Sequence, residues 1–329
     1  MKVCSKCVLP ETFPGVSFDN QGLCIFCQIA EKSPRDDKRP RLEKRFLEVI
    51  DQVRGMSLFD CVVAYSGGKD SSYLLDLLVS RYDLKVLAVT FDNWFLSEMA
   101  FHNIRAITKS LNVGHMVIRP PYELMKGLFS EASNRELYPK KSLERASTIC
   151  TACMSFVRFV CIRTAIEKDI PLVAFGFHPG QIPENAAIVK TNAALLKSFQ
   201  QAIYDPISSI VKDAARPFFL EEKHFASKNQ FPYIANPFGL IDYREEDVFL
   251  RIRQMGWKRV NDTDENSTNC LLNSYSNLIH YRKYKYHPYA SEIANMVRKG
   301  QIDRDEGLRR LHPPRVNRVV RAIAKLLND

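Results

Sequence analysis

The residues best suited to chemistry lie in one stretch, Val62–Ser72. Apolar residues lead into Ser66-Gly67-Gly68-Lys69-Asp70-Ser71, and helix-forming residues continue over 73–78. This pattern predicts a strand, a loop of phosphate-binding size and a helix. Glycines let the backbone approach an anion closely, and N–H groups at a helix start point toward it. The stretch therefore predicts an anion site, with an ordinary strand-to-helix turn as the alternative.

The side chains of this loop add further groups that suit a phosphate ligand. Lys69 brings a positive charge, Ser66 and Ser71 bring hydroxyl donors, and Asp70 can hold a magnesium ion. The sequence has no Walker A pattern, because no second glycine stands four residues before a Gly-Lys-Ser/Thr. We expect residues 66–72, which include Gly67, Gly68 and Ser72, to form the binding loop.

Two pairs of cysteines near the start of the sequence have the spacing of a metal site. Cys4-x-x-Cys7 and Cys24-x-x-Cys27 are separated by sixteen residues. Two such turns can close a tetrahedral four-thiolate site, whose usual occupant is zinc. A segment this short has almost no core of its own, so metal binding would supply its folding energy. An iron–sulfur cluster and free thiols are the alternatives.

A third pair, Cys150-x-x-Cys153, opens a long apolar stretch that predicts a helix through Ile166. The positive end of a helix lowers thiol pKa values. Two thiolates cannot complete a tetrahedral site, and Cys270 is the remaining candidate, because Cys161 falls inside the helix and suits the core. Three thiolates leave one iron of a four-iron cluster open to a sulfur or a substrate. A redox or persulfide pair and a second structural site are the alternatives.

The composition is that of a soluble protein with an anionic partner. The 329 residues are 46% hydrophobic and 26% charged, and the net charge is +10. No apolar run reaches membrane-spanning length and no signal-peptide core is present, so we expect a cytoplasmic protein without a membrane partner. The charge favours a nucleotide, a nucleotide-sugar or RNA. Nine cysteines in such a chain favour metal ligands or reactive thiols over disulfides.

Strands and helices alternate through the middle of the sequence. Further strands are predicted over 85–93, 115–119 and 171–177, with a helix over 97–112 between the first two. This alternation predicts an α/β fold with a doubly wound parallel sheet. Residues 184–230 are expected to be mainly helical, and 231–238 extended.

Ligands of such sheets bind beyond the carboxyl ends of the strands. Thr90 and Asp92 end one strand, and Gly176 and His178 end another, so all four are expected near the nucleotide site. Asp92 can instead cap the next helix. His178 is a candidate acid/base or phosphate-polarising group, with a solvated surface histidine as the alternative.

The last third of the sequence changes character. Residues 277–289 interleave basic and aromatic side chains, which suits either an anionic or ring-bearing substrate or a helix with one packed side. The basic, amphipathic tail 315–329 suits a solvated surface, an oligomer contact or RNA. We expect a homo-oligomer and three parts: a Cys4 zinc ribbon over 1–35, a nucleotide domain over 36–255, and a helical substrate or oligomer region over 256–329.

The hexapeptide Ser66-Gly67-Gly68-Lys69-Asp70-Ser71 resembles the signature of the PP-loop ATP pyrophosphatases, and the resemblance covers roughly residues 58–255. Such enzymes bind ATP with Mg²⁺, transfer AMP to a substrate oxygen and release pyrophosphate. The resemblance implies ATP binding by the loop, and we expect catalytic roles for Lys69, Asp70 and His178.

The two ends of the chain resemble a narrower group. The head, Cys-Ser-Lys-Cys-Val-Leu-Pro-Glu-Thr with Gly-Leu-Cys-Ile-Phe-Cys, and the tail, Tyr286-His287-Pro288-Tyr289 with residues 297–307, are similar to those of N-acetyl sugar amidotransferases of surface-polysaccharide synthesis. This resemblance implies that an amide oxygen is adenylated and that ammonia from a glutaminase displaces AMP. The sequence shows no glutaminase domain, so a separate partner is expected.

The cysteines in the middle of the chain resemble a different group. Cys150-x-x-Cys153 with Cys270 is similar to the cluster-binding set of the PP-loop tRNA thiolases, which use sulfur as the nucleophile. The match departs at Gly176-Phe177-His178-Pro179, where those thiolases carry Gly-His-x-x-Asp. We therefore favour an amidotransferase-like enzyme. A [4Fe-4S]-dependent sulfurtransferase acting on tRNA or a small molecule, with its own sulfur donor, is the second hypothesis. A non-catalytic nucleic-acid-binding zinc-ribbon protein is the third.

Overall fold

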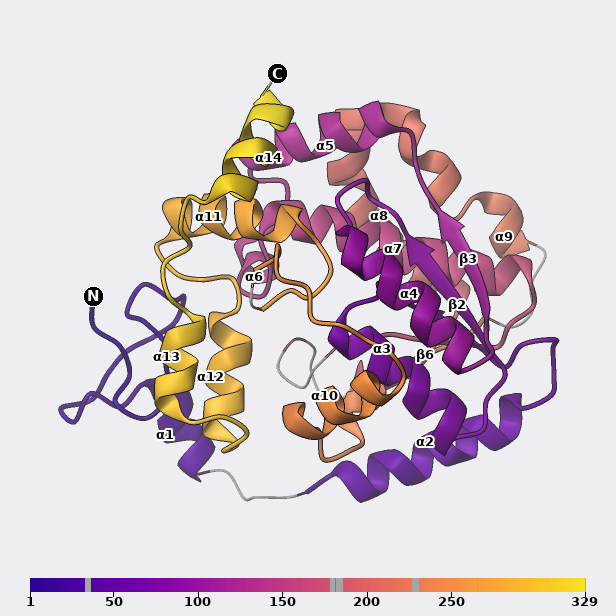
Figure 1. Ribbon diagram of the computed structural model, residues 1–329, viewed down its shortest axis with the longest axis horizontal. Coiled ribbons are helices and arrows are strands. Elements are labelled where there is room, and N and C mark those ends of the chain that lie inside the picture. Colours follow the sequence, from indigo (N-terminus) through magenta and orange to yellow (C-terminus); the bar gives the residue numbers. More distant parts are fainter. Residues whose placement is uncertain (33–36, 178–180, 182–185, 227–230, 265, 329) are drawn as a thin grey trace.

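A six-stranded sheet forms the centre of the protein (Figure 1). The computed structural model describes residues 1–329 except 33–36, 178–180, 182–185, 227–230, 265 and 329. The strands are β1 (Cys61–Ala64), β2 (Val86–Phe91), β3 (Gly114–Ile118), β4 (Leu172–Ala174), β5 (Ile188–Lys190) and β6 (Tyr233–Ala235).

Helices surround this sheet. They are α1 (Ile25–Lys32), α2 (Arg39–Val53), α3 (Lys69–Asp76), α4 (Glu98–Ser110), α5 (Tyr122–Asn134), α6 (Lys140–Leu143), α7 (Thr148–Glu167), α8 (Ala193–Val211), α9 (Glu222–Ala226), α10 (Glu245–Gln254), α11 (Leu272–Tyr284), α12 (Ala290–Arg298), α13 (Arg304–Arg310) and α14 (Arg318–Asn328). A π-helical turn, η1 (Leu77–Arg81), continues α3, and two 3₁₀ segments are η3 (Lys212–Phe218) and η4 (Pro237–Gly239).

The strand order is β3-β2-β1-β4-β6-β5, and all neighbours are parallel except β5, which pairs antiparallel with β6 at the edge. From β1 the chain builds outward through β2 and β3, then returns to β4 on the other side. The order therefore reverses between β1 and β4, the point where open α/β sheets bind ligands. The predicted α/β fold is confirmed. The described part of 184–230 is mainly helical, as expected, with α8, η3 and α9. The short strand β5 was not foreseen, because three residues are too few to show a strand's alternation.

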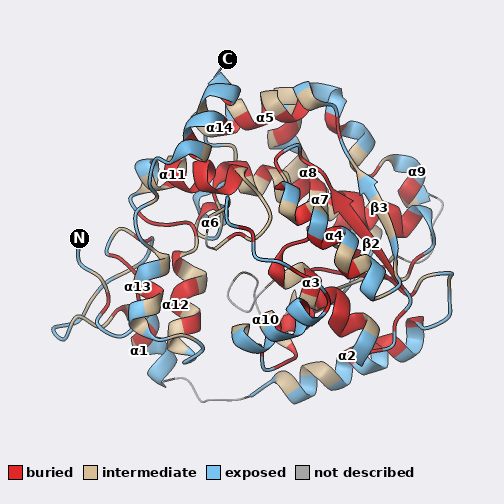
Figure 2. Ribbon diagram, in the orientation of Figure 1, coloured by how far each residue is buried: buried red, intermediate tan, exposed pale blue. Residues whose placement is uncertain are grey.

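Alternate residues of each strand face two separate cores, which explains the helices on both sides. Val62, Val89 and Val173 pack with α5 and α7 in one core. Val63 and Ala88 pack with α2, α3 and α10 in the other. The central strands are consequently buried on both faces (Figure 2), as expected of parallel strands covered by helices.

The N-terminal ribbon and the C-terminal helices share a third core. Val8, Leu9 and Phe13 pack against Tyr286 and Ile293, and α12 and α13 lie beside the first segment of the chain (Figure 1). Residues far apart in the sequence thus form one module. The boundaries predicted at 35 and 255 stay predictions.

Helix α7 is the only described helix that is long and apolar enough to cross a membrane by length and composition. It packs against β1 and β2 and also contacts α5 and α11. The apolar sequence of α7 is thus accounted for by contacts within the protein core.

Candidate functional site

The predicted loop lies between β1 and α3, at the carboxyl end of the central strand. Gly67 has φ +73°, and a Cβ there would lie 2.4 Å from the carbonyl oxygen of Ala100. The Gly67 carbonyl accepts a 3.0 Å hydrogen bond from the Trp257 indole, and the Lys69 N–H donates to Thr268 Oγ1 at 2.8 Å. Only glycine fits at Gly67, and distant residues hold the loop in shape.

Lys69 is the centre of a buried charge network. Its ammonium pairs with Glu245 at the start of α10 and lies 3.5 Å from Asp70 Oδ1. Burial opposes the charge of Lys69, but Asp70 and Glu245 outweigh it and raise its pKa above the ordinary value. Arg310 of α13 pairs with the other oxygen of Glu245, and the Tyr243 hydroxyl donates to Asp70 Oδ1 at 2.5 Å. Lys69 therefore stays protonated at neutral pH.

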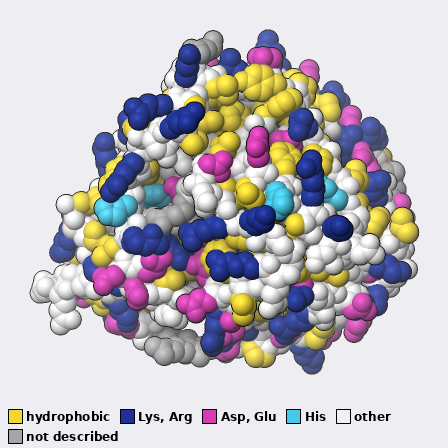
Figure 3. Space-filling view, viewed as in Figure 1, with side chains coloured by type: hydrophobic (Ala, Val, Ile, Leu, Met, Phe, Trp, Pro, Cys, Tyr) yellow, Lys and Arg dark blue, Asp and Glu magenta, His cyan; other side chains and the backbone are white. Residues whose placement is uncertain are grey.

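A cavity of about 150 Å³ opens at this network. Four cationic side chains line it, from α3, α13 and the segment after α10: Lys69, Arg259, Arg309 and Arg310. Asp70, Glu245 and Glu306 lie among them. Figure 3 shows basic side chains gathered over the middle of the face where α10, α12 and α13 lie, with acidic ones among them. The cavity combines helix-start N–H groups with excess positive charge, which suits a phosphate chain.

Sequence reasoning missed these partners of the loop. Tyr243, Glu245 and Arg310 lie far from Lys69 in the sequence, and no local motif links them. Three acidic residues begin α10, a pattern that by itself indicates only the start of a helix. Contact across such a separation is set by the packing of α10 against α3.

Some of the predicted loop residues form hydrogen bonds with one another. Ser66 Oγ and Ser71 Oγ lie 3.1 Å apart, and Ser71 Oγ also donates to the Gly68 carbonyl at 3.2 Å. Ser72 is fully buried beside the Tyr65 hydroxyl at 3.4 Å. The structure thus brings Ser66 and Ser71 together in the loop and places Ser72 in the core behind it.

The strand-end residues lie close by but have partners within the protein. Thr90 Oγ1 donates to the Tyr65 carbonyl at 2.7 Å. Asp92 is buried, pairs with Arg119 at 2.5 Å and accepts from the Trp94 N–H at 2.9 Å. A Cβ on Gly176 would lie 3.8 Å from the Asp70 carbonyl carbon. The segment that follows β4 therefore lies against the start of α3. His178 lies outside the described residues.

The three central cysteines converge near the end of β2. The Asn93 amide nitrogen lies 3.2 Å from Cys153 Sγ and 3.7 Å from Cys270 Sγ. Because both sulfurs contact the same nitrogen, they lie close to each other. Cys150 Sγ lies 3.2 Å from Ser276 Oγ. Burial, followed by the charge of Cys270, raises the pKa of Cys153. Burial, followed by the charge of Cys150, raises the pKa of Cys270, and the charge of Cys150 also raises the pKa of Cys153, so the three thiols share one site.

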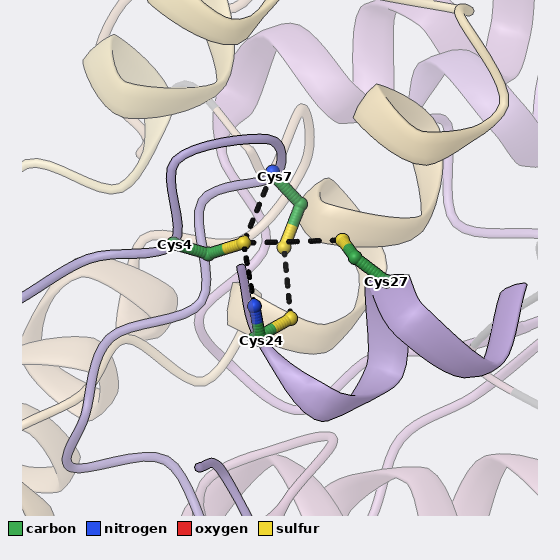
Figure 4. A group of neighbouring side chains, drawn as sticks. All are labelled: Cys4, Cys7, Cys24 and Cys27. Atoms are coloured by element: carbon green, nitrogen blue, oxygen red, sulfur yellow. Dashed lines mark hydrogen bonds between the residues drawn. The ribbon is translucent and has the colours of Figure 1, made fainter. Parts of the chain in front are cut away.

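The four N-terminal cysteines form a closed, buried group (Figure 4). Cys4 and Cys27 sulfurs lie 3.9 Å apart, and those of Cys7 and Cys24 lie 3.7 Å apart. A tetrahedral ion with Zn–S bonds of about 2.3 Å requires sulfurs about 3.8 Å apart. The four residues therefore fit one zinc ion and leave no position open for a substrate.

Backbone amides favour the thiolate form of Cys4 in this group. The N–H groups of Cys7 and Cys24 donate to Cys4 Sγ at 3.4 and 3.3 Å. Burial raises the pKa of Cys4, but these backbone hydrogen bonds outweigh it and lower the pKa to about 7. Arg298 of α12 lies 3.5 Å from Cys7 Sγ. The C-terminal helices thus help balance the negative charge of a four-thiolate site.

Comparison with known proteins gives one curated relative and a larger number of similar solved structures. No family model matches the chain. An uncharacterized protein of Methanocaldococcus jannaschii is 22% identical over 318 residues, which cover 95% of this chain and 94% of that protein.

Three solved structures resemble the chain. They are the U34-tRNA thiolase NcsA of Methanococcus maripaludis with its [4Fe-4S] cluster (14% identity, 100% of this chain and 89% of that one, TM-score 0.37), the NMN synthetase of Francisella tularensis (13%, 88% and 93%, 0.36) and the NH3-dependent NAD synthetase of Campylobacter jejuni (15%, 67% and 84%, 0.31). All three belong to the PP-loop family, the family that the loop of residues 66–71 resembles. Identities and TM-scores this low assign no function to this chain, so its function is inferred from its own residues.

Proposed function

We propose that this chain is a PP-loop ATP pyrophosphatase that adenylates an oxygen of its acceptor and releases pyrophosphate. One observation carries the proposal: a glycine loop with a protonated lysine lies beyond the central strand, where the strand order reverses. That position, the helix-start N–H groups and the surrounding arginines all favour a phosphate chain as ligand.

The residues of the loop have distinct roles in this proposal. Backbone N–H groups of Gly67 and Gly68 bind phosphate oxygens, and the Lys69 ammonium stabilises the charge that develops as pyrophosphate leaves. A phosphate at Lys69 replaces the carboxylate of Glu245 as its partner. Asp70 is the loop carboxylate that would hold Mg²⁺, which when bound neutralises phosphate charge. Adenylation turns a poor leaving oxygen into a good one, which is the reason to consume ATP.

The products of ATP test this proposal. Phosphorus NMR of the chain with ATP, Mg²⁺ and a panel of acceptors should show AMP and pyrophosphate. The variant Lys69→Met should lower the rate at least about 100-fold, whereas Lys109→Met, on the exposed side of α4, should leave it unchanged. ADP and phosphate as products, or full activity in Lys69→Met, would refute the proposal.

Nitrogen is the nucleophile that we favour for the second step. The head and tail resemblances support an amidotransferase, in which ammonia from a separate glutaminase displaces AMP from an adenylated amide. The packing of the ribbon against α12 and α13 agrees with this proposal, because the two segments that carry the resemblance form one module.

Sulfur transfer is the second candidate, and one contact favours it. The Asn93 amide points toward both Cys153 and Cys270 from the end of β2, the strand next to β1. Cys150, Cys153 and Cys270 would be the ligands of a [4Fe-4S] cluster, which when bound would carry the sulfur to be transferred. The acceptor would then be RNA or a small molecule.

Anaerobic purification separates the two candidates. A brown protein whose visible absorbance disappears in Cys150→Ala supports sulfur transfer. Cys161→Ala is the matched control, because Cys161 lies on the same helix but is buried in the core. A colourless protein that contains only zinc supports ammonia as the nucleophile.

A further inference from the structure

A second and larger cavity lies beside the loop site. Its volume is about 620 Å³, within the range of small-molecule sites. Helices α7 and α8 and the ends of β4 and β6 enclose it, and most of its lining is apolar, including Ile162, Phe175, Phe177, Leu196, Phe199 and Ile203. Nothing in the loop chemistry described above uses this cavity.

Two arginines line this cavity. Arg145 is exposed and donates to the Gln181 carbonyl at 3.0 Å, whereas Arg158 lies among the apolar walls. Arg158, from the middle of α7, lies 4.8 Å from the ring centroid of Phe177 and 5.5 Å from that of Phe199. Its contacts within the described part of the chain are these two rings, with no carboxylate paired to it. Burial lowers the pKa of Arg158 to about 10, so it remains charged at neutral pH. Arg158 is half-buried. A partly desolvated cation without a counter-charge is costly, and an anionic ligand would supply one.

The segment that follows β4 lies between the cavity and the loop. Phe175 and Phe177 line it, whereas Gly176 between them lies on the opposite side, against Asp70. Along α7, Cys150, Met154 and Arg158 all line the cavity and repeat every four residues, so they share one helix face. The rise of 1.5 Å per residue places Cys150 and Arg158 about 12 Å apart along the helix axis.

We infer that this cavity is the acceptor site and that the acceptor is an organic anion with a mainly apolar body. The assignment as an acceptor site rests on the proposed function. Arg158 binds the carboxylate or phosphate of the acceptor, and the aromatic and aliphatic side chains cover its body. The anionic group is a recognition group and lies away from the reacting end. A free sugar fits this cavity poorly, because apolar walls leave most of its hydroxyl groups without partners.

A pair of fluorescent probes tests this assignment. 8-Anilinonaphthalene-1-sulfonate carries an anionic group on an apolar body, and N-phenyl-1-naphthylamine has a similar body without the charge. The full-length protein should bind one equivalent of the sulfonate. Arg158→Gln should weaken that binding at least about tenfold and leave the neutral probe unaffected. Arg321→Gln removes one exposed arginine from α14 and should change neither.

A blocking variant and two competitors complete the test. Met154→Trp, which fills the cavity between Cys150 and Arg158, should abolish binding of both probes, with circular dichroism verifying the fold. 1-Naphthoate and 1-naphthyl phosphate should each displace the sulfonate, and the better competitor identifies the head group. Equal sulfonate affinity in wild type and Arg158→Gln would overturn the assignment, as would undiminished binding in a folded Met154→Trp.

These measurements need no ATP, so they are independent of the loop. Binding that depends on Arg158, in a chain that never forms AMP, would support the anion site and count against the proposed function. AMP formation without binding that depends on Arg158 would overturn the anion site alone.

Discussion

Replacing Gly67 with alanine should destabilise the protein in two ways, through backbone strain and through a steric clash of the new Cβ. At φ +73° any residue with a Cβ is strained, by about 1–2 kcal/mol. The new Cβ would also lie 2.4 Å from the Ala100 carbonyl oxygen and 2.8 Å from Ile104 Cγ1. The carbonyl belongs to the backbone of α4, so relief requires the loop or the helix to shift, at a further cost of about 1–3 kcal/mol.

Gly55 provides the matched control. Its φ is +72°, and a Cβ there meets nothing within 4 Å, so Gly55→Ala carries only the backbone cost. Urea unfolding should show that Gly67→Ala loses about 1–3 kcal/mol more than Gly55→Ala. Gly67→Ala should also lose ATP binding, since the displaced loop no longer presents its N–H groups. Equal stabilities of the two variants, or unchanged ATP affinity in Gly67→Ala, would refute the close approach to α4.

Two further perturbations test the surroundings of the loop. Glu245→Gln should lower stability by about 1–3 kcal/mol at pH 7, because Lys69 and Arg310 lose a buried partner. The folded pKa of Glu245 is lowered, since its ion pairs outweigh burial, so its contribution is complete above pH about 4.5 and disappears as pH falls through the folded pKa. Urea unfolding from pH 7 to pH 3 should therefore show the two proteins converge, and a constant difference would contradict the network. Cys24→Ser should remove one zinc per chain and raise hydrogen exchange over 286–311, which shares the core of the ribbon, whereas Cys161→Ala should do neither. Unchanged exchange in zinc-free protein would show that this module needs no metal.

The sequence predicted the features that local patterns encode. The loop could be read from Ser66–Ser71 because glycine, lysine and hydroxyl residues stand between an apolar strand and a helix. The ribbon could be read because the ligands come in two close pairs. The parallel strands were recognisable from their apolar runs, and the extended segment at 231–238 contains β6.

Other features depend on contacts that no local pattern records. Thr90 and Asp92 were expected near the nucleotide, but hydrogen bonds to Tyr65 and Arg119 occupy their side chains. The contact of Asn93 with Cys153 and Cys270 depends on how α7 and the segment before α11 pack at the end of β2. The charge network at Lys69 likewise forms only when α10 and α13 meet the loop.

The position of a bound nucleotide tests the central claim most directly. A crystal structure of the protein with Mg²⁺ and a non-hydrolysable ATP analogue should place the phosphates against the N–H groups of Gly67 and Gly68. The ammonium of Lys69 should turn from Glu245 to a phosphate oxygen. Phosphates bound elsewhere, with the Lys69–Glu245 pair intact, would contradict the account.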